Sequence, residues 1–212
     1  AESALAERVL AERPDHGFVG EEHGVQGRAE SPWRWIVDPI DGTSGFVRGI
    51  PVWATLIALI HDEAGVEVAV VSAPALGRRW WAVRGEGAFA DGRRCRVSDV
   101  SRIADAQVNI TWGQGWAAAG RTDALVALAT EARRSRGFGD FWQHCLVAEG
   151  ALDVAIDAIG VAPYDIAAVR LIVEEAGGRF TDRHGEPTHE HDSAISTNGV
   201  LHDEIIARLS RP

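Results

Sequence analysis

Residues 35–43, Trp-Ile-Val-Asp-Pro-Ile-Asp-Gly-Thr, join an apolar strand to a turn that carries two carboxylates. Successive strand residues point to opposite faces, but the proline between the acids bends the chain. Asp38 and Asp41 can therefore converge on one point, where their oxygens are suitable ligands for Mg²⁺. The free backbone N–H groups of Gly42 and Thr43 could receive a phosphate. This turn predicts metal-assisted chemistry on a phosphate ester.

The composition is that of a globular protein with ample material for a core. The chain has 212 residues, of which 46% are hydrophobic, enough for one large domain or two lobes. Its formal net charge of −10 argues against nucleic acid as a partner, because binding a phosphate backbone requires a basic face. A phosphate monoester stays compatible with this charge, since bound divalent cations reverse it locally. No apolar run reaches the ~18 residues of a membrane span, so we expect no membrane partner.

The cysteines and the start of the chain give two further expectations. Cys95 and Cys145 do not have the spacing of a zinc site and are expected to be reduced, buried thiols of a cytoplasmic protein. The sequence has no methionine, no signal peptide opens it, and residues 1–5 are typical of the middle of a helix. We therefore expect a segment to precede Ala1.

The periodicity of apolar residues changes near residue 104 and predicts two lobes. Residues 1–104 favour an antiparallel α+β lobe, and residues 105–212 favour an α/β lobe. In the first lobe we expect a helix over 1–13, a loop over 23–32, and strands over 18–20, 33–37, 52–60, 66–72, 79–83 and 88–89. In the second we expect strands over 108–110, 152–156 and 194–197, and helices over 122–132, 142–149, 165–176 and 201–209.

Three acidic clusters fall where strands end or helices begin. Glu21 with its neighbour Glu22 follows a short strand, and taken alone is typical of a solvated turn. Asp165 stands where a carboxylate stabilises the start of a helix by ~1 kcal/mol. Asp38 and Asp41 are different, because apolar residues flank them and buried carboxylates need a compensating charge. A metal ion would supply that charge.

The order of these clusters resembles the inositol monophosphatase superfamily. The resemblance rests on residues 20–22, 35–43 and 164–168, and extends to 85–89, 175–178 and 196–199. It implies a layered αβαβα sandwich and a Mg²⁺-dependent hydrolase of small phosphate monoesters, with two or three ions per site. It also implies a homodimer.

The resemblance assigns roles to individual residues. The implied Mg²⁺ ligands are Glu21, Asp38, the backbone carbonyl of Ile40, Asp41 and Asp165. Glu21 and Thr43 would orient the attacking water, and Asp38 would bridge two ions, so these three are the implied catalytic residues. The implied phosphate-binding groups are the N–H groups of Gly42 and Thr43 and the hydroxyl of Ser44. Two positions depart from the family pattern: Gly45 replaces a common asparagine, and Ala158 replaces a glutamate that often contacts substrate hydroxyls.

The predicted substrate pocket contains a carboxylate that such phosphatases usually lack. Asp140 is followed by two aromatic residues, and a carboxylate in that setting suits an amine or imidazolium cation better than a neutral polyol. Together with residues 47–55, it resembles the histidinol-phosphate phosphatase branch, which implies L-histidinol phosphate as substrate in histidine biosynthesis. Asp140 is the first candidate for binding the amine or imidazole, and Asp157 the second. The alternative is that Asp140 caps the following helix.

Other interpretations of the sequence stay open. An inositol-1-phosphate or broad sugar-phosphate phosphatase would use the same metal ligands, and a family member could also act chiefly as a protein-binding regulator. His184, His189 and His191 invite a zinc interpretation, but glycine and proline around them favour a hairpin loop. His144 is expected on a helix near the pocket, without a catalytic role.

Overall fold

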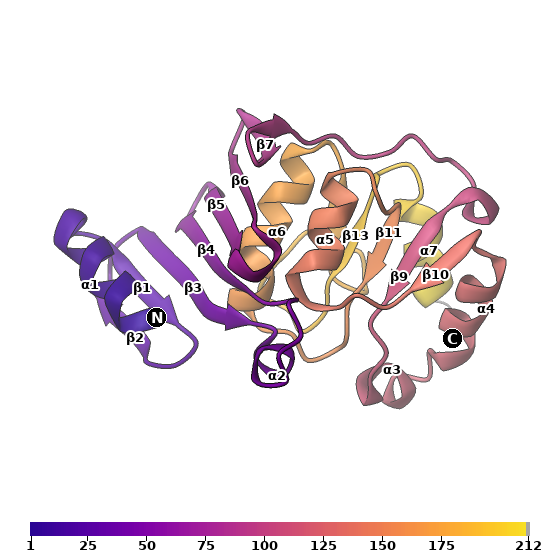
Figure 1. Ribbon diagram of the computed structural model, residues 1–212, viewed down its shortest axis with the longest axis horizontal. Coiled ribbons are helices and arrows are strands. Elements are labelled where there is room, and N and C mark those ends of the chain that lie inside the picture. Colours follow the sequence, from indigo (N-terminus) through magenta and orange to yellow (C-terminus); the bar gives the residue numbers. More distant parts are fainter. Residues whose placement is uncertain (211–212) are drawn as a thin grey trace.

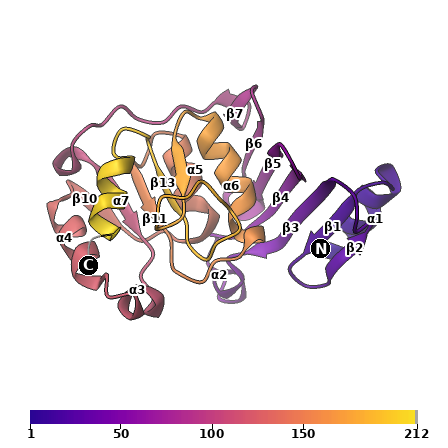
Figure 2. The same cartoon turned by 180° about the vertical axis from the view of Figure 1, so that it is seen from behind.

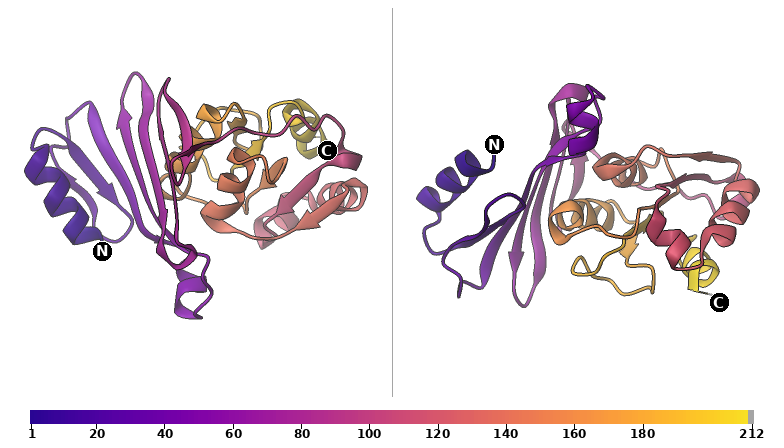
Figure 3. Two further views of the ribbon diagram at one scale, coloured as in Figure 1. Left: turned by 45° about the horizontal axis from the view of Figure 1, so that its top comes forward. Right: turned by 90° about the horizontal axis from the view of Figure 1, so that it is seen from below.

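Helices and sheets alternate in five layers through the molecule (Figure 1). The structure, a computed structural model, describes residues 1–210. Helix α1 (Glu2–Glu12) covers one face of an eight-stranded sheet, and α5 (Asp140–Ala148) and α6 (Pro163–Glu175) cover the other. A five-stranded sheet follows, with α4 (Thr122–Glu131) and α7 (His202–Ser210) outside it. Figure 3 shows the first sheet nearly edge-on, with α1 and the orange helices on opposite sides. The αβαβα sandwich is thus confirmed.

The first sheet has the order β2-β1-β3-β4-β5-β6-β7-β8. Strands β1 and β3 are parallel, and every other neighbouring pair is antiparallel. The predicted loop over 23–32 is wrong in part, because it contains β2, which pairs with β1 at the sheet edge. The strands are β1 (Gly17–Gly20), β2 (Gly24–Gly27), β3 (Trp33–Asp41), β4 (Ala54–His61), β5 (Gly65–Ala73), β6 (Arg78–Val83), β7 (Gly87–Ala90) and β8 (Arg93–Arg94).

The second sheet is mixed and has the order β10-β9-β11-β13-β12. Strands β9, β10 and β11 are parallel, and β13 is antiparallel to both of its neighbours. A short helix, α3 (Gln114–Ala118), lies beyond the end of β9. The strands are β9 (Gln107–Ile110), β10 (Arg134–Arg136), β11 (Val154–Ile156), β12 (Arg179–Thr181) and β13 (Ile195–Thr197).

Helix α6 lies in the middle of the sandwich and joins the two sheets. Because both sheets pack against it, its apolar side chains are buried on more than one face, among them Ile166, Val169, Leu171 and Val173. The helix begins with Pro163, whose missing N–H costs nothing at that position. The division into two lobes stays a prediction, since the helices of residues 105–212 pack against the sheet of residues 1–104.

Two of the segments that carry the family resemblance, 85–89 and 175–178, contact each other in the structure. The Glu175 carboxylate at the end of α6 accepts the N–H groups of Gly85 (2.9 Å) and Gly87 (2.8 Å), and so ties the β6–β7 turn to that helix. Cys95 and Cys145 are both free and buried, as predicted. None of the helices in residues 1–210 is long and apolar enough to span a bilayer.

Candidate active site

The end of β3 and the start of α6 lie close together (Figure 2), and three aspartates from distant parts of the chain meet there. One carboxylate oxygen from each of Asp38, Asp41 and Asp165 lies within 4.8 Å of the others. Asp38 and Asp41 are buried, and Asp165 is partly buried. The sequence predicted that these three acids would gather, and the structure brings them together.

A β-bulge makes this meeting possible. Asp38 pairs with Leu56, and Asp41 pairs with Ala54. Between these two pairs, β3 contains one residue more than β4. The Thr55 hydroxyl donates to the Pro39 carbonyl (2.9 Å) inside the bulge. Without the extra residue, two acids three positions apart on a strand would point to opposite faces. The bulge turns both toward α6.

Each of the three carboxylates is held by one backbone N–H. The N–H of Ile40 donates to Asp38 Oδ1 (2.8 Å), that of Phe141 to Asp41 Oδ2 (2.7 Å), and that of Ala162 to Asp165 Oδ2 (2.7 Å). These bonds orient the acids and leave the second oxygen of each without a backbone donor. Asp165 therefore caps α6, as its position suggested, and also joins the acidic cluster.

The electrostatics of the cluster suit a bound cation. Burial, then the charge of Glu21, raise the pKa of Asp38 to about 8. Burial, with the charges of Asp140, Asp38 and Asp165, raises the pKa of Asp41 well above its ordinary value, and burial raises that of Asp165. The main charges acting on each acid are therefore other carboxylates. Hard oxygen donors in such an arrangement fit Mg²⁺, which would neutralise the repulsion.

Glu21 stands beside the cluster rather than inside it. It is exposed on the turn after β1, and its N–H donates to the Val37 carbonyl (3.3 Å). Its charge acts on both Asp38 and Asp165, so its side chain faces the same space.

A buried glutamate that the sequence did not single out supports the Glu21 turn. The Glu2 carboxylate, on α1, accepts the N–H of Glu22 (2.8 Å), the N–H of His23 (2.9 Å) and the imidazole Nδ1 of His23 (3.0 Å). A Cβ atom on Gly20 would lie 2.2 Å from the Glu2 carboxyl carbon, so only glycine leaves room for this contact. Glu2 is fully buried, and the amino-acid pattern of α1 by itself does not indicate this burial.

The predicted phosphate-binding turn follows Asp41 directly. Gly42 has φ +82°, and a Cβ there would lie 2.8 Å from the Val52 carbonyl oxygen, so the turn requires glycine. Helix α2 (Thr43–Val47) then begins, with Thr43 and Ser44 exposed. The Thr43 hydroxyl donates to the Ile40 carbonyl (2.8 Å), whose second lone pair stays available to a metal ion.

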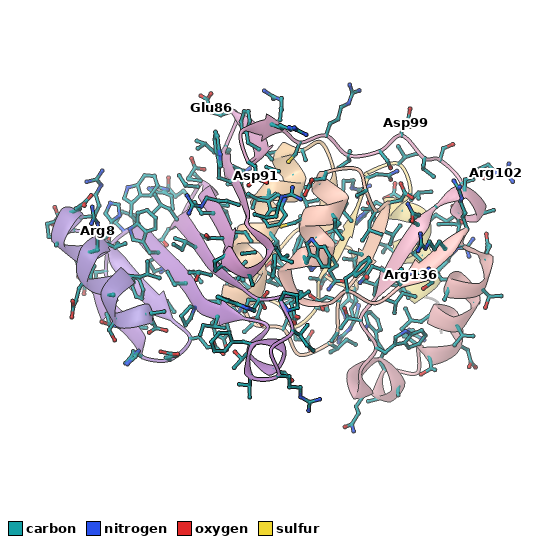
Figure 4. The ribbon with its side chains drawn as sticks, viewed as in Figure 1. Arg8, Glu86, Asp91, Asp99, Arg102 and Arg136 are labelled. Atoms are coloured by element: carbon teal, nitrogen blue, oxygen red, sulfur yellow. The ribbon has the colours of Figure 1, made fainter. Side chains whose placement is uncertain are left out.

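A cavity of about 340 Å³ opens beside these acids. It is lined by four carboxylates, and none of the described residues that line it is basic. Two of the arginines labelled in Figure 4, Arg8 and Arg102, lie at opposite ends of the molecule. The lining residues are Asp41, Gly42, Thr43, Ser44, Gly45, Thr111, Asp140, Asp157, Ala158, Ile159, Gly160, Val161 and Asp165. Metal-ligand candidates and both substrate candidates thus share one cavity.

Asp140 has an unusual backbone for a residue at the start of a helix. Its φ is +51°, a left-handed conformation that L-residues rarely adopt and that aspartate and asparagine tolerate best. The start of α5 has no side-chain cap, and the N–H of Phe141 donates to Asp41 and not to Asp140. Asp140 instead faces the cavity, where burial and the charges of Asp157 and Asp165 raise its pKa to about 6. These contacts argue against the capping alternative.

Asp157 is anchored at the end of β11. Its Oδ1 accepts the N–H of Ala158 (2.8 Å), and its Oδ2 lies 3.1 Å from the Nε2 of His144. The sequence analysis expected His144 on a helix near the pocket but did not predict this contact. His144 lies on α5 and Asp157 directly follows β11, and no sequence pattern links them.

The histidine-rich segment forms the loop between β12 and β13. The Asp182 carboxylate accepts the N–H groups of His184 (2.7 Å) and Glu186 (2.8 Å) and contacts His191 Nδ1 (2.8 Å). His189 is buried, so the loop is less solvated than expected. Among residues 1–210, no group of metal-ligating side chains includes these histidines.

Comparison with known proteins gives matches along the whole chain. The model of the inositol monophosphatase family matches residues 1–211. Histidinol-phosphatase of Mycobacterium tuberculosis is 48% identical over 218 residues, covering 99% of this chain and 81% of that protein. Histidinol-phosphatase of Streptomyces coelicolor is 44% identical over 219 residues, covering 100% and 81%. The solved structure of an inositol monophosphatase from Anabaena has a TM-score of 0.89 at 25% identity, covering 98% of this chain and 83% of that one.

Proposed function

Because this chain belongs to the inositol monophosphatase family, we propose that it hydrolyses L-histidinol phosphate to L-histidinol and phosphate with the help of Mg²⁺. The phosphatase activity is supported by relatives named histidinol-phosphatase. The assignments of the substrate and of the metal are supported by the residues of the site. The observation that carries the proposal is a cavity lined by two groups of carboxylates, the metal-ligand candidates Asp41 and Asp165 and the substrate candidates Asp140 and Asp157.

The first group would hold the metal ions. Its ligands in this proposal are the carboxylates of Asp38, Asp41, Asp165 and Glu21, with the carbonyl of Ile40. Mg²⁺, with two or three ions per site, would supply a nucleophilic water of lowered pKa and would neutralise the leaving alkoxide. Mg²⁺ ions held by these acids would offset their negative charge and present a cation to the phosphate dianion.

The residues around the metal site would orient the reacting groups. Glu21 faces Asp38 from an exposed turn, so its carboxylate can accept a proton from the attacking water. The Thr43 hydroxyl, which donates to the Ile40 carbonyl, would accept a hydrogen bond from the same water. The N–H groups of Gly42 and Thr43 and the Ser44 hydroxyl would hold the phosphate oxygens, since all three residues line the cavity.

The second group argues for a cationic substrate. Asp140 and Asp157 line a cavity that has no basic residue in its lining, so a neutral polyol would bring no positive charge to either carboxylate. L-Histidinol carries an ammonium and an imidazole, which are charge-assisted donors for carboxylates. We therefore assign Asp140 and Asp157 to the recognition of this end of the substrate, in agreement with the strained backbone at Asp140.

A panel of phosphate esters tests the proposal. We expect purified protein with Mg²⁺ to hydrolyse L-histidinol phosphate with a kcat/KM at least about tenfold above that for inositol-1-phosphate, which corresponds to one charge-assisted hydrogen bond. Chelation should abolish both activities, and Mg²⁺ should restore them. Preference for inositol-1-phosphate would contradict the substrate assignment, and undiminished activity after chelation would contradict the metal.

The cellular setting of the enzyme is part of the same proposal. Hydrolysis of L-histidinol phosphate would be a step of histidine biosynthesis in the cytoplasm, and we expect a homodimer. Partner binding that survives replacement of both Asp38 and Asp41 by asparagine would instead favour a regulatory role.

A further inference from the structure

A buried line of side chains connects the core of the second sheet to the cavity. On α5, His144 contacts Ser196 of β13 through Nδ1 (2.7 Å) and Asp157 through Nε2 (3.1 Å). His144 is 1% exposed and Ser196 fully buried. The proposed reaction assigns no role to this histidine, although it touches a carboxylate of the cavity wall.

The line has the members of a nucleophilic triad but not its accessibility. A nucleophilic serine must reach the substrate, and Ser196 lies inside the sheet with no exposed surface. Only the Asp157 end of the line borders the cavity. Ser196 and His144 can therefore affect the cavity only through Asp157.

The hydrogen bonds of the line fix the imidazole. A carboxylate can only accept, so the Nε2–H of His144 donates to Asp157 Oδ2. In a neutral imidazole Nδ1 then accepts, and the Ser196 hydroxyl donates to it. The ring is further enclosed by Phe180, with 5.9 Å between ring centroids.

Asp157 is thereby held at both oxygens. Oδ1 is bound by the N–H of Ala158 and Oδ2 by His144, and the Asp157 backbone is fixed as well, since its N–H donates to Ala194 (2.9 Å) and its carbonyl accepts the indole N–H of Trp116 (2.8 Å). The remaining lone pairs of the carboxylate are free for a donor inside the cavity. A carboxylate held in this way needs little reorganisation when a cation arrives.

We propose that His144 is a positioning residue, which orients Asp157 toward the cationic end of the substrate and so contributes to selectivity for amine-bearing phosphate esters. This inference rests on the proposed function, because it assumes that the second carboxylate group recognises a cation. His144 itself touches neither the substrate nor the reacting atoms.

Two substitutions and a double-mutant cycle test the role. His144→Leu removes the donor, and His144→Gln keeps an N–H near the position of Nε2. We expect His144→Leu to raise KM for L-histidinol phosphate about tenfold with kcat changed less than about threefold, since one hydrogen bond is lost on the binding side. KM for inositol-1-phosphate should stay constant, and His144→Gln should recover much of the loss.

The cycle uses Asp157→Asn and L-histidinol binding measured by calorimetry with Mg²⁺ present. If His144 acts through Asp157, His144→Leu should weaken L-histidinol binding in the wild-type background and have no further effect in Asp157→Asn. Additive losses, or equal losses for both esters, would overturn the inference. Should His144→Leu not fold, Ser196→Ala releases the imidazole from the other side and should give the same pattern at smaller amplitude.

The two proposals can fail separately. A wild-type protein that does not turn over L-histidinol phosphate contradicts the proposed function. The calorimetric cycle with L-histidinol then still decides whether His144 positions Asp157, because it needs no turnover.

Discussion

At the scale of single residues, the sequence predicted the residues of the candidate site better than the residues that support them. Asp38 and Asp41 were predicted to converge because a proline between acids at a strand end is a local signal, and the family resemblance added Asp165 to them; the structure brings all three together. Glu2 was not singled out, and the contact between His144 and Asp157 was not foreseen, because both depend on tertiary contacts that have no local pattern. Patterns report on neighbours along the chain, and support from other elements appears only once the fold brings them together.

The charge of Asp140 can be tested without disturbing its backbone. Asp140→Asn should keep the left-handed conformation, which asparagine tolerates as well as aspartate, so the free energy of unfolding should change by less than about 1 kcal/mol. Loss of one charge-assisted bond should raise KM for L-histidinol phosphate by about 10- to 100-fold and leave inositol-1-phosphate unaffected. Steady-state kinetics on both esters measure this. A uniform loss of activity would mean that Asp140 serves the metal site instead.

The raised pKa of Asp38 predicts a pH-dependent stability of the metal-free protein. Its folded pKa, about 8, lies above the unfolded value of 3.8, so the folded state binds the proton more tightly. The stabilisation is fully present below pH 3.8 and is lost as the pH rises toward 8. Between pH 5 and pH 8 we therefore expect thermal unfolding of the metal-free protein to shift downward, and less so in Asp38→Asn. Added Mg²⁺ should restore the wild type at pH 8; equal pH slopes in both proteins would contradict this account.

At the scale of elements, the failures of prediction have a common cause. The long strands and helices were predicted well because their apolar residues repeat regularly. Strand β2 was taken for a loop, since two of its four residues are glycine and its side chains are at most half-buried. Strand β10 reads Arg-Ser-Arg and has no apolar residue at all. Such strands exist because a neighbouring strand offers hydrogen bonds, which a single segment of sequence does not reveal.

Helix α1 is expected to support metal binding through Glu2, which holds the turn that carries Glu21. Glu2→Ala removes three hydrogen bonds to the turn that follows Glu21, so the Glu21 side chain should lose its fixed direction. Loss of such support typically weakens metal affinity by about 10- to 100-fold. Calorimetric titration with Mg²⁺ measures the effect directly. Glu7→Ala, an exposed glutamate on the same helix, is the matched control and should bind Mg²⁺ normally.

Contradictory outcomes for Glu2 are easy to recognise. If Glu2→Ala and Glu7→Ala have the same Mg²⁺ affinity as the wild type, the Glu21 turn does not need its anchor. A lowered melting temperature with unchanged affinity would show that Glu2 serves the fold alone.

At the scale of the whole molecule, the site depends on the sandwich as a unit. Asp38 and Asp41 come from the first sheet, Asp165 from the central helix α6, and Asp157 from the second sheet. The cavity therefore exists only while both sheets pack on the helices between them. A chain whose two halves unfolded independently would lose the site each time either half opened.

We therefore expect both sheets to unfold in one cooperative transition, although periodicity divides the chain near residue 104. Leu171, fully buried on α6, tests this, because Leu171→Ala should lower the free energy of unfolding by about 2–5 kcal/mol. Hydrogen exchange resolved by strand measures the effect separately in β4 and β11. The shared helix predicts that protection falls by the same factor in both strands. If β11 alone lost protection, the halves would unfold separately, and the acidic cluster would then bind Mg²⁺ through Asp38 and Asp41 without Asp165.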